Sequence, residues 1–245
     1  KFSLDAYRYI ANQAEYILHS YAISIGITAA GTVISLLMTT MLAYPLSRKE
    51  LPHRNFFSFM VFFTLLFNGG LVPTYLMYVN VFHIKNTFLG LLIPNLLMSG
   101  FNVLLARTFF AMNIPDEIIQ SASIDGAGEF RIFFSIVMPC SLPILATLGL
   151  FVGIGYWNDW YNGLIYVTDP NYFNIQNVLN NMLRNIQFLQ NNPGIASSMG
   201  RAATNLPAAT VRMAIAVVGV IPILIIYPCF QQYFVKGIMI GAVKG

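Results

Sequence analysis

The sequence is poor in charge. Asp, Glu, Lys and Arg together make up 9% of its 245 residues, against roughly 25% in an ordinary soluble domain. Hydrophobic residues make up 57%. This balance excludes an ordinary soluble domain and predicts that most of the chain lies in lipid. The net charge is +4, but the cations are scattered along the chain and form no patch, so no nucleic acid partner is expected.

Groups that bind metals or catalyse reactions are also missing. His19, His53 and His83 stand far apart without carboxylate or cysteine companions, which predicts no metal site. No Gly-x-x-x-x-Gly-Lys-Ser/Thr loop occurs, so the chain lacks that route to ATP. Cys140 and Cys229 fall in apolar segments, where a thiol packs as a small hydrophobe. Without a nucleophile and base or a carboxylate pair at a convincing site, no catalytic residue and no cofactor is predicted in this chain.

Long apolar stretches are present instead. A bilayer core about 30 Å thick takes roughly 20 apolar residues per spanning helix. Five stretches without Asp, Glu, Lys or Arg exceed this length, namely 16–47, 55–84, 86–106, 132–158 and 213–235. They predict an all-α membrane protein with five spanning helices. Because the first residue is Lys1 and no charged leader is present, we expect the chain to start within a longer gene product whose sixth, N-terminal helix is missing here.

The basic turn 48–54 orients these spans. Short basic loops stay on the cytoplasmic side of the membrane, and Lys and Arg are only slightly more frequent on that side overall. Alternation then assigns the remaining segments: 1–15 is an outer-face lead-in, 16–235 is the transmembrane domain with an inner loop at 113–139 and an outer loop at 159–212, and 236–245 is a cytoplasmic tail.

The outer loop is too long to be an idle connection. Its apolar residues recur at helical spacing, and Asn and Gln fill most other positions; they are Ile175, Val178, Leu179, Met182, Leu183, Ile186 and Leu189. This pattern predicts an amphipathic helix outside the membrane. Packing on the rest of the chain and docking of a partner are both compatible with it.

The inner loop predicts a helix, a sharp turn and a second helix. Pro115 suits a first helical position, and Asp116 and Glu117 would follow in the first turn, where the helix dipole favours anions. The helix can run about ten residues before Asp125-Gly126, where glycine allows the left-handed conformation that ends helices. An apolar stripe of Ile118, Ile119 and Ala122 is predicted to fit a groove on another protein.

This loop resembles the cytoplasmic coupling motif of ABC importer permeases, written Glu-Ala-Ala, three residues, Gly, nine residues, Ile, one residue, Leu-Pro. Here the motif reads Gln120-Ser121-Ala122, Gly126, Ile136 and Met138-Pro139, with the spacing kept. Gln120, Ser121 and Met138 depart from the usual residues, and a neutral Gln offers only hydrogen bonds where the family's Glu resembles a salt-bridge partner. The resemblance implies contacts with an ATPase at Pro115, Gln120, Ser121, Ala122, Asp125, Gly126, Ala127, Ile136 and Pro139.

Other segments are similar to the MalG-type permeases of maltose-class sugar importers. They are 44–48, the aromatic run 156–162, and 234–237 with 241–245. The resemblance implies a type I ABC importer transmembrane domain in a bacterial cytoplasmic (inner) membrane. It implies a homologous second permease, an ATPase dimer that binds ATP and Mg, and a solute-binding protein. It further implies an oligosaccharide substrate, with acidic ones such as alginate included, and a tail that reaches the ATPases through Lys236, Gly237, Gly241 and Lys244.

The substrate path is less defined. A polar amide within an apolar span faces either a neighbouring helix or a watery path, which makes Asn68 and Asn95 candidates. Tyr156, Trp157 and Asn158 could contact a sugar, although aromatic residues are also enriched where a helix leaves the bilayer. A secondary transporter or channel not coupled to ATP is the alternative function, but ion-coupled carriers usually keep charged groups in their spans, and these spans contain no Asp, Glu, Lys or Arg.

Overall fold

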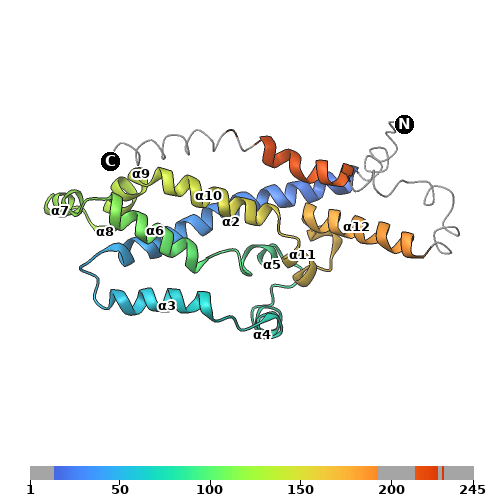
Figure 1. Cartoon of the computed structure of the whole chain (residues 1–245), viewed down its shortest axis with the longest axis horizontal. Coiled ribbons are helices and arrows are strands. Elements are labelled where there is room, and N and C mark those ends of the chain that lie inside the picture. The colour runs from blue at the N-terminus through green and yellow to red at the C-terminus, as the bar shows by residue number, and fades with distance from the viewer. Residues whose placement is uncertain (1–13, 193–212, 226–227, 229–245) are drawn as a thin grey trace.

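The computed structural model describes residues 14–192, 213–225 and 228, and all regular secondary structure in them is helical. The molecule is elongated (Figure 1). Its long helix α2 (Ala14–Ser47) packs against both α6 (Gly100–Asn113) and α10 (Leu142–Trp157). The spans are therefore built around α2.

Small residues on one face of α2 let its neighbours approach. Ser20, Ser24, Gly31 and Ser35 are buried at helical spacing, a pattern that allows close helix packing within membranes. A Cβ atom added at Gly31 would lie 2.5 Å from the ring of Tyr156 on α10. Glycine is required there because the ring occupies the space that any side chain would need.

The first two helices after α2 form a bent pair. Helix α3 (Arg54–Leu66) is followed by α4 (Leu71–Leu76) and the π-helical turn Met77–Val81, and the two parts are bent by 109°. The Asn68 side chain accepts a hydrogen bond from the Gly70 amide, 2.8 Å long, in the connection. The predicted span 55–84 is thus made of two helices in the structure, a bend that the sequence pattern did not indicate.

The predicted span 86–106 is also broken. Helix α5 (Phe88–Leu92) is separated from α6 by an irregular stretch that contains Pro94 and a left-handed Asn95. Two carbonyl groups near the break accept side-chain hydrogen bonds, from Tyr156 to Leu92 O at 2.8 Å and from Asn162 to Pro94 O at 2.8 Å. Irregular backbone is tolerated within membranes where the protein itself satisfies it.

The predicted span 132–158 bends by 82° at Ser141. Before the bend lie α8 (Glu129–Ile132), the π-helical turn Phe133–Val137 and α9 (Met138–Cys140), and after it α10. By length and composition, one described helix, α2, could cross a membrane, and up to three spans exist if each bent pair is counted as one. A shorter apolar helix, Met213–Ile225, covers the start of the predicted fifth span.

The outer loop contains the predicted amphipathic helix. After α11 (Tyr161–Tyr166) and the 3-10 turn Pro170–Tyr172, helix α12 runs from Ile175 to Asn191. Its apolar face is buried through Ile175, Val178, Leu179 and Met182, so packing on the chain is confirmed for this face. The lead-in 1–13 and the tail 236–245 lie outside the described residues.

Candidate coupling loop

Helix α7 (Asp116–Ile124) is the predicted helix of the inner loop. Pro115 is its N-cap residue, with φ −61° and ψ 137°, so the helix begins one residue later than the sequence suggested. Asp116 and Glu117 lie in the first turn, where carboxylates compensate the unpaired amides of a helix start. The helix is therefore short, rigid and fixed at both ends by local sequence.

A Schellman turn ends α7 at Gly126. The Ala127 amide donates to Ala122 O at 2.9 Å, and the Gly126 amide donates to Ser123 O at 3.0 Å, the two bonds that define this motif. Gly126 has φ +81°, with open space around it. The predicted left-handed glycine is confirmed. No neighbouring atom would clash with a side chain, so glycine is needed here for its backbone conformation alone.

The two faces of α7 differ from the sequence prediction. Ile119 is only 3% exposed and packs in a core cluster with Tyr44 and Phe110. The stripe predicted to dock on another protein was therefore wrong for Ile119, because this side chain fastens α7 to its own chain. The outward side chains are Ile118, 43% exposed, Ile124, 86% exposed, and Phe130 on α8, 70% exposed.

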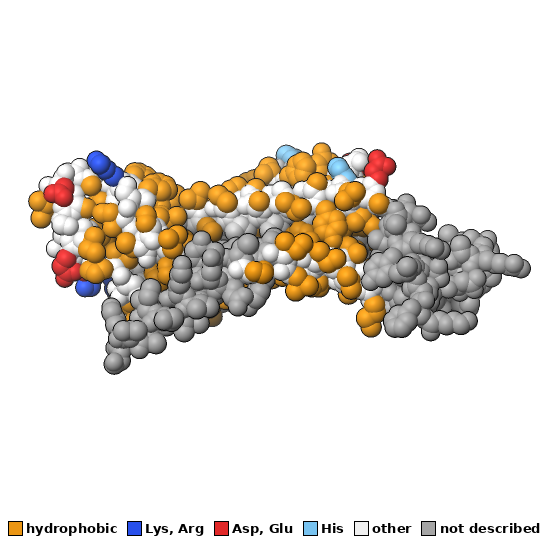
Figure 2. Space-filling view, turned by 90° about the horizontal axis from the view of Figure 1, so that it is seen from above, with side chains coloured by type: hydrophobic (Ala, Val, Ile, Leu, Met, Phe, Trp, Pro, Cys, Tyr) orange, Lys and Arg blue, Asp and Glu red, His pale blue; other side chains and the backbone are white. Residues whose placement is uncertain are grey.

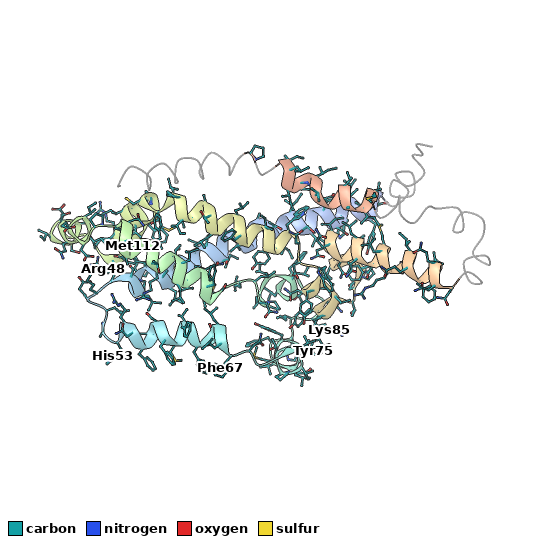
Figure 3. The ribbon with its side chains drawn as sticks, viewed as in Figure 1. Arg48, His53, Phe67, Tyr75, Lys85 and Met112 are labelled. Atoms are coloured by element: carbon teal, nitrogen blue, oxygen red, sulfur yellow. The ribbon has the colours of Figure 1, made fainter. Side chains whose placement is uncertain are left out.

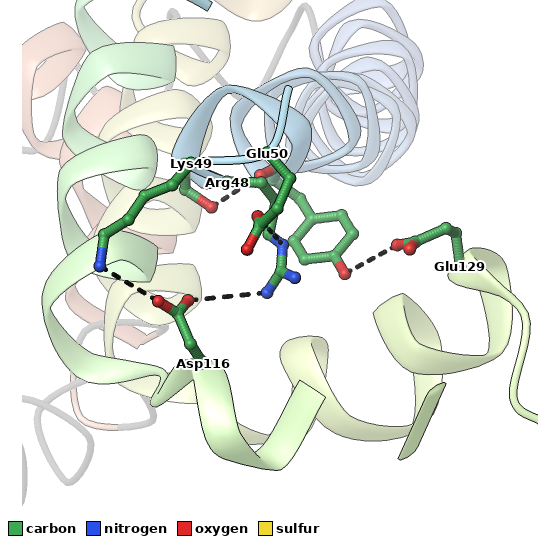
Figure 4. Close-up of polar contacts among 7 residues, drawn as sticks. Arg48, Lys49, Glu50, Asp116 and Glu129 are labelled. Atoms are coloured by element: carbon green, nitrogen blue, oxygen red, sulfur yellow. Dashed lines mark hydrogen bonds and ion pairs between the residues drawn. The ribbon is translucent and has the colours of Figure 1, made fainter. Parts of the chain in front are cut away.

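Charged side chains tie α7 to the turn after α2 (Figure 4). Asp116 lies 3.2 Å from Lys49 Nζ and 3.7 Å from Arg48 Nη1, and Arg48 Nε lies 3.4 Å from Glu50. The Lys49 side chain is largely exposed, so its pair with Asp116 contributes at most about 1 kcal/mol. The Arg48 side chain is mostly buried, and its guanidinium group forms ion pairs with both Glu50 and Asp116.

A second contact joins α2 to α8. The Tyr44 hydroxyl donates to Glu129 at 3.0 Å, and its ring lies 5.6 Å from that of Phe133. Arg107 on α6 donates to Leu46 O at 3.0 Å, which satisfies one carbonyl near the end of α2. Sequence reasoning missed Tyr44, Lys49, Asp116 and Glu129 as anchors, because their partners are distant in the chain.

The remaining motif residues continue into the bent span. Ile136 is half-buried in the π-helical turn and Pro139 is exposed in α9. Gln120, Ser121 and Asp125 are exposed on α7 and its turn, whereas Ala122 and Ala127 are half-buried. The loop is thus a rigid exposed element, held by α2 on one side and continuous with the helix that leads to Ser141 on the other.

The ion pairs of Asp116 predict that substitutions of the two neighbouring acids, Asp116 and Glu117, will differ in their effects on α7. Asp116→Asn should increase amide hydrogen exchange across α7, because it weakens the ion pairs with Lys49 and Arg48 by about 1 kcal/mol in total. Glu117→Gln is the matched control, since Glu117 also lies in the first turn but has no ion pair among the described residues. Equal exchange in the two variants would show that the dipole, and not the anchor, fixes the helix.

The structure divides the predicted path residues into two groups. Tyr156 and Trp157 are 3% and 4% exposed, and their polar atoms donate to Leu92 O and Gly219 O. Their faces are covered by the chain itself, so neither ring can stack on a sugar in this arrangement. Asn68, Asn95 and Asn158 have exposed side chains.

The turn after α10 holds the half-buried carboxylate of Asp159. Asp159 accepts hydrogen bonds from the amides of Tyr161 and Asn162 at 3.1 and 3.0 Å and so caps the start of α11. Burial raises the pKa of Asp159, and these amide bonds oppose the rise. The neighbours Trp160 and Tyr161 are each about two-fifths exposed. Within the described residues, no group of three His, Cys, Asp or Glu side chains could hold a metal ion.

The described residues form helices, with broken apolar spans and an exposed helix-turn-helix between two of them. Comparison with known proteins gives the class of protein to which this arrangement belongs. Residues 22–240 match the family described as the binding-protein-dependent transport system inner membrane component. The chain belongs to this family. It is a multi-pass permease subunit of ABC-type sugar importers in the inner membrane, and nothing in the comparisons favours a secondary transporter or channel.

Individual relatives match this chain along nearly its whole length. The polygalacturonan/rhamnogalacturonan transport system permease protein YtcP of Bacillus subtilis is 38% identical over 244 residues, covering 100% of this chain and 82% of the relative. The protein LplC of the same organism is 36% identical over 246 residues, covering 100% and 80%. A bacterial ABC transporter involved in the import of the acidic polysaccharide alginate is 27% identical, with a TM-score of 0.79 and coverage of 95% and 80%.

Proposed function

We propose that this chain forms, together with a homologous second permease, the membrane path for an acidic oligosaccharide delivered by a solute-binding protein. The main support for an acidic substrate is the similarity over the whole chain to a permease described for polygalacturonan and rhamnogalacturonan. The solved relative described for alginate supports the same class. Galacturonans and alginate are both polymers that contain uronic acids and are therefore acidic polysaccharides.

The coupling loop, defined as residues 113–139, is the proposed contact with a separate ATPase pair that binds ATP and Mg. Its exposed tip carries the outward side chains of Ile118, Ile124 and Phe130, and exposed apolar groups of this kind mark interaction sites. Gln120 and Ser121 lie beside them on the exposed surface. Because α7 is anchored through Asp116 and continuous with the bent span through α8, a force on the tip would reach the spans.

This arrangement fits the proposed topology. Charged side chains gather at the end of the molecule that carries α7, and a largely apolar surface separates them from the other end (Figure 2). We assign 48–54 and 107–131 to the cytoplasm, 80–85 and 159–212 to the outer face, and the tail, with Lys236, Gly237, Gly241 and Lys244, to a contact between the ATPases. Asn68, Asn95 and Asn158 remain the proposed path residues, since their amides are exposed.

Substrate-dependent ATP hydrolysis tests this proposal. The complete transporter is reconstituted in liposomes, and its solute-binding protein is supplied empty or loaded with oligogalacturonate, an alginate oligomer or a neutral arabino-oligosaccharide. We expect hydrolysis to rise with an acidic oligomer and to stay near the empty level with the neutral one. Stimulation by the neutral sugar alone would overturn the acidic class, and no stimulation by any loaded binding protein would overturn coupled import.

A further inference from the structure

A cationic cavity lies beside the coupling loop. It has a volume of about 450 Å³ and lies between the turn after α2, the start of α3, the end of α6 and the start of α7. Arg48, Lys49, Arg54 and Arg107 line it, against a single carboxylate, that of Asp116. Arg48 and Met112, both in the lining, lie at the same end of the molecule (Figure 3).

Two of these cations have no counter-ion in the described part of the chain. Arg48 and Lys49 share Asp116, but Arg54 and Arg107 have no ion pair there. Arg107 uses only its Nε atom, on Leu46 O. Positive charge therefore exceeds negative charge in the wall, and a cavity with low-dielectric walls increases the attraction for an anion.

A buried donor in the wall also lacks an acceptor. Arg48 Nη1 is shielded from solvent and makes no hydrogen bond with the described residues, since Asp116 at 3.7 Å is too distant for one. Because Nη1 is closed off from solvent, an oxyanion in the cavity would bind the more open donors of Arg54 and Arg107. Phosphate oxygens match the planar donors of arginine.

The cavity adjoins an apolar surface that suits hydrocarbon chains. Arg54 is the first residue of α3, and Phe56, Phe57 and Phe59 follow it with about half of each side chain exposed. A ligand with an anionic head and apolar tails would place the head among the arginines and the tails along α3. Basic pockets between membrane helices bind the phosphate groups of acidic lipids in this way.

We infer that this cavity binds the phosphate headgroup of an anionic phospholipid and that the lipid fastens α3 and α6 to the base of the coupling loop. The inference goes beyond the proposed transport function, because lipid binding does not depend on which solute the complex carries. It adds a role for Arg54 and Arg107, which the coupling motif does not include. An anionic membrane would thereby stabilise the geometry of the loop.

Photolabelling of the assembled transporter tests the site. The complex is placed in phosphatidylcholine nanodiscs that contain a trace of photoactivatable phosphatidylglycerol, and labelled peptides are mapped. We expect labels within 44–54 and 107–116. Arg54→Gln should reduce this labelling about fivefold, the effect of one cation near an anionic lipid. Arg54→Lys should retain it. Lys85→Gln changes an exposed cation that lies well away from the cavity (Figure 3) and should leave the labelling unchanged.

Two further arms identify the source of the phosphate. Millimolar inorganic phosphate or glycerol phosphate should not displace the lipid label, and a phosphatidylcholine probe should label the site much less. Displacement by free phosphate, equal labelling by the zwitterionic probe, or absence of label at these peptides in the parent complex would each overturn the inference. Because the readout is binding and not ATP hydrolysis, its failure is distinguishable from failure of the transport proposal.

Discussion

Gly126→Val is expected to abolish most coupling between the permease and its ATPases while leaving the spans folded. Gly126 has φ +81°, and the left-handed conformation costs an ordinary L-residue about 1–2 kcal/mol, with a further penalty for a β-branched one. Nothing lies within 4 Å of an added Cβ atom, so the cost comes from the backbone alone. The variant should favour turns that do not close the Schellman bonds.

The consequence for docking follows from the population of the closed turn. In the proposed complex the ATPase binds α7 in its native orientation and therefore binds only molecules whose turn is closed. The apparent affinity of the ATPase for the permease falls in proportion to that fraction, up to about thirtyfold for a 2 kcal/mol penalty. The measurement is pull-down of the ATPase together with substrate-stimulated hydrolysis in liposomes. Membrane insertion and thermal unfolding of the spans should resemble the parent.

The chain supplies matched controls for this change. Gly128→Ala alters a nearby glycine that has φ −70° and open space, so it should be neutral. Gly126→Asn should be milder than Val, because Asn tolerates the left-handed region. Gln120→Ala removes an exposed amide and should also be mild. A Gly126→Val complex that assembles and couples like the parent while Gln120→Ala fails would show that side-chain contacts, and not the turn, transmit the motion.

Local signals made α7 predictable from the sequence. Its start depends on Pro115 and the acids after it, and its end depends on Gly126, so each boundary is set within a few residues of itself. The same holds for α12, whose apolar positions recur at the helical period. These elements need no information from distant parts of the chain.

The breaks in the spans were not predictable in this way. Composition identifies a stretch such as 86–106 as apolar, but the interruption at Pro94 and Asn95 is stabilised by Tyr156 and Asn162 from a segment far along the chain. A proline alone does not determine whether a helix is interrupted, because α2 continues through Pro45. Whether a helix breaks depends on whether distant side chains satisfy the released carbonyl groups.

The anchors of the coupling loop were missed for the same physical reason. The motif identifies the residues of the tip, but Tyr44 and Glu129 are 85 positions apart and meet only because α2 and α8 pack together. Ile119 was assigned outward because a short apolar stripe cannot show which of its members faces the chain's own core. In a helix as short as α7, spacing alone does not show whether the apolar stripe faces the chain's own core or a partner.

Gly31→Ala is expected to destabilise the packing of α2 on α10 by about 1–3 kcal/mol, the usual cost of overfilling a packed interior. The added Cβ atom would lie 2.5 Å from two atoms of the Tyr156 ring, which is closer than carbon atoms can approach. The ring cannot easily move aside, because it is buried and its hydroxyl is bonded to Leu92 O. Either the two helices separate or this bond at the α5 break is lost.

The helix α2 provides the control for this prediction, since Gly26 is exposed and has nothing within 4 Å of an added Cβ atom. Gly26→Ala should be neutral or stabilising by up to about 1 kcal/mol, because alanine favours a helix interior more than glycine does. Thermal unfolding of the purified complex in detergent measures both variants. Adding Tyr156→Ala to Gly31→Ala removes the ring, so the second change should cost less in the Gly31→Ala variant than in the parent. If the two glycine-to-alanine variants unfold at the same temperature, or if the double variant is additive, the contact between Gly31 and Tyr156 does not hold α2 against α10.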